Sequence, residues 1–140
     1  MPANGRHLAE ELEMYRLIGV AWFVLLSPVF VAAGAWAQSG QGTFSGASGH
    51  ATSGGVTIAE GTAGYEVRLQ ENFSFDGAPD PRVTLGSGTA LNAVDLGELA
   101  SKKGAQVYSV PAGTDPARFD KIVIYCRKYS VPLGIADLKR

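Results

Sequence analysis

Cysteine is the scarcest functional residue in this chain of 140 residues, since Cys126 is the only one. A single thiol excludes a disulfide within the chain and a zinc site built from four thiolates. An excess of one charge is also absent, because 12 basic residues stand against 13 acidic ones. A strongly basic nucleic-acid binder is therefore not expected. The hydrophobic content of 46% argues against a disordered chain.

The common nucleotide and hydrolase motifs are missing as well. The glycine-rich residues 39–55 contain neither a phosphate-binding Gly-Lys-Ser/Thr loop nor a dinucleotide fingerprint between a strand and a helix. No Gly-x-Ser-x-Gly nucleophile elbow occurs anywhere. We therefore interpret the glycines of residues 39–55 as linker and turn.

An uncharged, mostly apolar stretch begins at Leu17 and ends at Ala37. Ala35 and Ala37 are the small residues that signal peptidase requires, so we predict export with cleavage after Ala37. An uncleaved membrane anchor over residues 17–37 is the alternative, because the stretch approaches the ~20 residues that span a bilayer. Both interpretations leave Arg16 on the cytoplasmic side and export the remainder. The exported part would be periplasmic, secreted or membrane-anchored.

The rest of the chain has the pattern of an all-β protein. Short apolar or alternating runs are separated by clusters of glycine, proline, aspartate and serine, which is typical of a β-sandwich or small barrel. We expect strands at residues 56–58, 65–69, 73–75, 83–85, 107–110 and 119–125. Only residues 95–103 look helical, as a short turn or brief helix after an Asp95 cap. The predicted organisation is a signal peptide or anchor at 1–37, a linker at 38–42 and one β domain at 43–140.

Two aspartates flank a Gly-Ala-Pro turn, at Asp76 and Asp80. Carboxylates so close together can contribute to a calcium site. A turn stabilised by aspartate hydrogen bonds to the backbone is the interpretation we favour.

The strand around Cys126 leaves two roles open for its thiol. Cys126 has the same parity as Ile122 and Ile124, which favours a buried, inert side chain, as is common for free cysteine. An unpaired thiol is nevertheless unusual in an exported protein. Arg127 and Lys128 follow at once, and neighbouring cations favour the reactive thiolate.

Several segments together resemble a known family in the same order. They are GTF at 42–44, HATSGGVTI at 50–58, VRLQENF at 67–73, GAPD at 77–80, DLGEL at 95–99, GAQVYSVP at 104–111 and IVIYCRKYSVPLGIADL at 122–138. This pattern resembles the electron-transfer DM-thirteen (DM13) domain family, the Skeletor type, and covers nearly all of the chain after about residue 42.

The resemblance implies a β-rich, extracytoplasmic redox module. In this family a cysteine is thought to act as a naked thiol or as a ligand to a prosthetic group such as haem, and here that residue is Cys126. Arg127 and Lys128 would tune the thiolate, and His50 would be a second ligand candidate, against a histidine hydrogen-bonded to backbone at a strand edge. Because one cysteine cannot form an internal disulfide, exchange needs the thiol of a partner. We expect a redox partner protein in the cell envelope and no nucleic acid.

A second hypothesis makes the chain a non-catalytic β-sandwich for binding or cell-envelope adhesion. Under it Cys126 is a structural core residue.

Overall fold

The computed structural model describes residues 38–140, so the predicted signal peptide or anchor at residues 1–37 lies outside the described residues. The strands are β1 (Gln38–Gly46), β2 (Thr52–Ser53), β3 (Gly55–Gly61), β4 (Gly64–Leu69), β5 (Ser74–Phe75), β6 (Pro81–Ser87), β7 (Ala90–Glu98), β8 (Gln106–Ser109), β9 (Lys121–Cys126) and β10 (Val131–Asp137), with a 3-10 turn η1 (Pro116–Arg118) before β9. The predicted all-β class is confirmed. No helix within residues 38–140 is long and apolar enough to cross a membrane.

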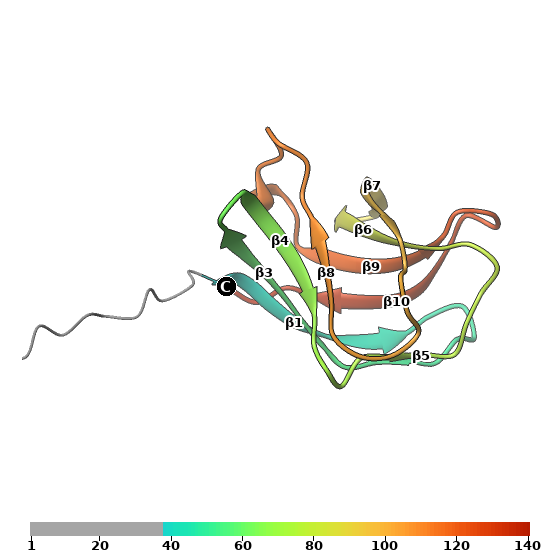
Figure 1. Cartoon of the computed structure of the whole chain (residues 1–140). Coiled ribbons are helices and arrows are strands. Elements are labelled where there is room, and N and C mark those ends of the chain that lie inside the picture. The colour runs from blue at the N-terminus through green and yellow to red at the C-terminus, as the bar shows by residue number, and fades with distance from the viewer. Residues whose placement is uncertain (1–37) are drawn as a thin grey trace, which may run out of the picture. The chain divides into compact units, whose positions relative to one another are not determined.

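Eight of these strands form one antiparallel sheet in the order β7-β6-β9-β10-β1-β3-β4-β8. The sheet curls until its edge strands β7 and β8 contact each other, which makes a nearly closed barrel (Figure 1). The short strands β2 and β5 pair with each other beside it. All six predicted runs overlap observed strands, namely β3, β4, β5, β6, β8 and β9.

One hydrophobic core fills the barrel. Alternating residues of the strands point inward, as the two-residue period of a β-strand requires. Its fully buried large side chains include Ile58, Leu69, Leu85, Ile122 and Ile124. Phe44 and Phe73 pack edge to face inside it, with ring centroids 5.5 Å apart. The buried side chains are mostly apolar, with Thr52, Thr84 and Gln106 as the buried polar exceptions, so most of the polar side chains lie on the outer surface and in the loops.

The expected linker at residues 38–42 is instead the first half of β1. This strand joins the two parts of the sheet, since it pairs with β3 through Thr43 and with β10 from Phe44 onward. The glycines that suggested a linker allow the strands to approach closely: a Cβ on Gly42 would lie 2.5 Å from the main-chain oxygen of Asp137. The interpretation of residues 39–55 as linker and turn is therefore wrong for β1.

The expected helix at residues 95–103 is also wrong, because Asp95 lies within β7. Its carboxylate accepts from the Gly97 N–H at 2.8 Å and binds Arg82 Nε at 3.0 Å. Gly97 has φ +121° at an irregularity of the β6–β7 register. The local hydrogen bond that resembles a helix cap in sequence thus stabilises a bulge in an edge strand.

Candidate functional site

Cys126 is the last residue of β9 and lies between two other strands. It pairs with Pro81 of β6 on one side and with Val131 of β10 on the other. Its side chain is 1% exposed and belongs to the same core as Ile122 and Ile124. The burial predicted from strand parity is confirmed. The thiol therefore sits at one end of the barrel, directly under the turn that connects β9 to β10.

That turn is tied to the β5–β6 loop by Arg127. The Arg127 N–H donates to the Asp80 main-chain oxygen at 3.1 Å, and its Nε donates to Asp80 Oδ2 at 2.8 Å. Lys128 points elsewhere, with Nζ 5.5 Å from the centroid of the Tyr129 ring. The guanidinium of Arg127, the residue after Cys126, is thus held by the Asp80 carboxylate. Tuning of the Cys126 thiolate by Arg127 and Lys128 stays a prediction.

His50 is held by a carboxylate as well. Its Nδ1 lies 2.9 Å from Asp76 Oδ1, while the Ala51 N–H donates to Asp76 Oδ2 at 3.0 Å. Because an ionised carboxylate only accepts hydrogen bonds, His50 donates through Nδ1. The hydrogen bond from Ala51, followed by that from His50, lowers the pKa of Asp76 below its usual 3.8. The expected backbone partner of His50 is therefore replaced by a side chain.

These two pairs bring three loops to the same end of the barrel. The β5–β6 loop contributes both Asp76 and Asp80, which bind the β1–β2 loop through His50 and the β9–β10 turn through Arg127. Figure 1 shows the three loops together at the right-hand end of the view. Of the two aspartates, only Asp76 accepts a backbone hydrogen bond through its side chain, and the donor is Ala51 of the β1–β2 loop rather than a residue of the predicted turn. Within residues 38–140, no cluster of three metal-ligating side chains is present.

The placement of Cys126 and His50 does not fit a haem. Hollows of about 910, 790 and 570 Å³ occur on the surface, and neither residue lines them. A haem iron bound to the Cys126 sulfur would require its macrocycle to replace core side chains, because the sulfur is enclosed on every side.

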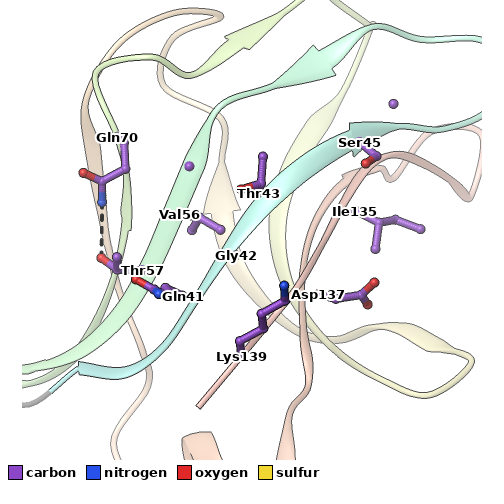
Figure 2. Close-up of a pocket in the computed structure, with 12 residues that line it drawn as sticks. Gln41, Gly42, Thr43, Ser45, Val56, Thr57, Gln70, Ile135, Asp137 and Lys139 are labelled. Carbon is purple, nitrogen blue, oxygen red and sulfur yellow. Dashed lines mark hydrogen bonds between the residues drawn. The ribbon is translucent and has the colours of Figure 1, made fainter.

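The 910 Å³ hollow is a groove on the outer surface of β1, β3 and β10 that the sequence pattern did not reveal. Figure 2 shows its polar side chains standing on adjacent strands, with Gln70 donating to Thr57 at 3.4 Å. The β1 side chains Gln41, Thr43 and Ser45 alternate with Gly42 and the buried Phe44. Amides and hydroxyls of this kind are typical of the solvent face of a half-buried sheet.

The described residues thus form a small antiparallel barrel with one buried thiol at its loop-bound end. A comparison with protein families finds that the model for Electron transfer DM13 matches residues 43–138. The chain therefore belongs to the DM13 electron-transfer family, as the motifs suggested. No curated protein and no solved structure matches it.

Proposed function

We propose that this chain is an extracytoplasmic redox module that works through Cys126 as a naked thiol. Membership of an electron-transfer family supports a redox role, and Cys126 is the only thiol in the chain. The observation that carries the proposal is the position of Cys126 at the barrel end, one residue from an exposed turn. A ligand role toward haem is less well supported, because the sulfur is enclosed by the core.

The chemistry available to one thiol is exchange with a partner. The Cys126 thiolate attacks a disulfide of a partner protein; one S–S bond breaks, one forms between the proteins, and the partner releases a thiolate. The exchange conserves electrons: one partner sulfur leaves as the thiolate, and the other stays bonded to Cys126 until a thiol of a third protein attacks it and releases the Cys126 thiolate. Because the Cys126 side chain is 1% exposed, the barrel end must open first. The β9–β10 turn and the Asp80–Arg127 pair are the parts that would move.

Export is the second half of the proposal. Residues 17–37 would act as a cleaved signal or as an anchor, and the barrel would meet its redox partner in the cell envelope. Mass measurement of the mature chain tests cleavage after Ala37.

The redox proposal is tested on the exported protein in its native state. Mass spectrometry after brief exposure to peroxide or to an alkylating agent should show modification at Cys126, and reaction with an excess of a small disulfide should yield one mixed disulfide per chain. A thiol that reacts only after unfolding would contradict the proposal. An absorption spectrum tests the haem alternative, since a bound haem gives a coloured protein.

The adhesion hypothesis keeps one specific observation in its favour, which is the enclosure of Cys126 among core side chains. Under it the Cys126→Ser change weakens folding and leaves binding to the cell envelope intact. Loss of a redox phenotype with unchanged melting would exclude it.

A further inference from the structure

Two consecutive lysines, Lys102 and Lys103, occupy the loop between β7 and β8 and are exposed. Neither has an ion pair with any residue of the part that the structure describes. Some cations there are paired, such as Arg82 with Asp95 and Lys121 with Asp137, and others, such as Arg118 and Lys139, are not. Two adjacent unpaired ammonium groups repel each other, so an anion placed between them is stabilised.

The backbone that carries these lysines is held firmly. Gln106, which is 9% exposed, donates from Nε2 to the Ser101 oxygen at 2.7 Å and accepts at Oε1 from the Ser101 N–H at 3.1 Å. Ser101 Oγ donates to the Lys103 oxygen at 2.9 Å. The Phe75 N–H donates to the Lys102 oxygen at 2.8 Å. The positions of both lysine Cα atoms are therefore preorganised, which lowers the entropic cost of binding.

A hollow of about 570 Å³ lies between this loop and β5. Its lining comprises Ala51, Ser74, Phe75, Asp76, Ser101, Lys102 and Lys103. The Ser74 hydroxyl has no hydrogen-bond partner within residues 38–140. Lys102 lies across Gly77, where an added Cβ would be 3.4 Å from the lysine Cδ and 3.7 Å from Nζ. Lys102, Lys103 and Ser74 thus all line the same hollow.

Asp76 limits what this hollow can accept. Its carboxylate oxygens are engaged by His50 Nδ1 at 2.9 Å and by the Ala51 N–H at 3.0 Å, so the carboxylate does not pair with the lysines. Its negative charge also lines the hollow and repels any anion there, so a bound anion would lie on the side of the two lysines. The hollow therefore suits one compact oxyanion rather than a polyanion.

We propose that this hollow binds a single phosphate group through Lys102 Nζ, Lys103 Nζ and Ser74 Oγ. Ammonium groups bind phosphate as point charges, and charge-assisted hydrogen bonds to phosphate oxygens are stronger than neutral ones. Free inorganic phosphate and the head group of an anionic phospholipid present the same chemistry. The site is separate from the thiol and does not depend on the redox proposal.

The test is a titration of the full-length protein with inorganic phosphate, followed by the amide NMR signals of Ser74, Lys102 and Lys103. Chloride at equal ionic strength is the reference. We expect shifts that saturate with phosphate and not with chloride. In the double variant Lys102→Gln, Lys103→Gln the dissociation constant should rise at least about tenfold. The variant Arg118→Gln, Lys139→Gln removes the same charge elsewhere and should retain the wild-type affinity.

Sedimentation with vesicles then identifies the source of the phosphate. Retention by vesicles of phosphatidylglycerol, competed by inorganic phosphate and lost in the Lys102/Lys103 variant, indicates a lipid head group. Saturable phosphate binding without such retention indicates free phosphate. Amide shifts with phosphate that are no larger than those with chloride would contradict the proposed site. So would an equal rise of the phosphate dissociation constant in both double variants, provided that their melting temperatures match that of the wild type.

Discussion

Arg127 holds Asp80 by two contacts, from its main-chain N–H at 3.1 Å and from its Nε at 2.8 Å. Cys126 is the residue before this double contact, and Pro81, its cross-strand partner, is the residue after Asp80. Any opening that exposes the thiol must therefore separate these two segments or lift the turn that Arg127 begins.

We expect Arg127→Gln to raise the rate at which native Cys126 is alkylated by about two- to fivefold. The Arg127 side chain is 63% exposed, so the pair contributes no more than about 1 kcal/mol. Lowering the free energy of local opening by about 0.5–1 kcal/mol raises the population of the open state about two- to fivefold. The measurement is the alkylation rate at low reagent excess. The control Arg118→Gln, which removes an exposed cation from η1, should leave that rate unchanged. An unaltered rate in Arg127→Gln would mean that Cys126 becomes exposed without separation of Arg127 from Asp80.

We expect Cys126→Ser to lower the free energy of unfolding by about 1–3 kcal/mol, because the serine hydroxyl would be buried in an apolar core. Cys126→Ala loses the sulfur contacts instead and tests the same site without a new polar group. Denaturant unfolding of both variants measures the effect. Both should lose thiol exchange completely, and a stability equal to the wild type in Cys126→Ser would show that the sulfur is accessible to water in solution.

The pairing of Asp76 with Ala51 and His50 predicts a contribution to stability that depends on pH. Since these hydrogen bonds lower the folded-state pKa of Asp76 below 3.8, the carboxylate stabilises the fold above that value and loses its effect as the pH falls through the lowered pKa. Asp76→Asn should therefore show a smaller fall in melting temperature between about pH 5 and pH 3 than the wild type. Glu71→Gln changes an exposed carboxylate with no hydrogen bond among residues 38–140 and should follow the wild-type curve. Identical acid curves for Asp76→Asn and the wild type would contradict this role.

The all-β class and the inward direction of Cys126 could be predicted because they depend on local alternation. The two ion pairs at the barrel end could not, since His50 and Asp76 are 26 residues apart and Asp80 and Arg127 are 47 apart. No local pattern reports such contacts; they arise from the way the strands are ordered in the sheet.

The sequence pattern does not predict β1, β2, β7 and β10, and two of these strands show a second limit of such patterns. β7 lies at an edge of the sheet and is largely exposed, so it lacks a strong apolar alternation. β1 contains Gly40, Gly42 and Gly46, which reduce the apolar signal and resemble a linker. In both strands the tertiary partners decide the conformation against local propensity.

The close approach at Gly42 can be tested by adding one methyl group. A Cβ at Gly42 would lie 2.5 Å from the main-chain oxygen of Asp137, so Gly42→Ala must push β10 away from β1. We expect a loss of about 1–3 kcal/mol in the free energy of unfolding, as for other overpacked sites. Gly40→Ala is the matched control, because its Cβ would meet its nearest neighbours at an ordinary 3.5 Å. If residues 38–42 were a linker in solution, both variants would unfold at the same denaturant concentration as the wild type. If Gly42→Ala alone unfolds at a lower denaturant concentration, β1 lies against β10 at Gly42 in solution.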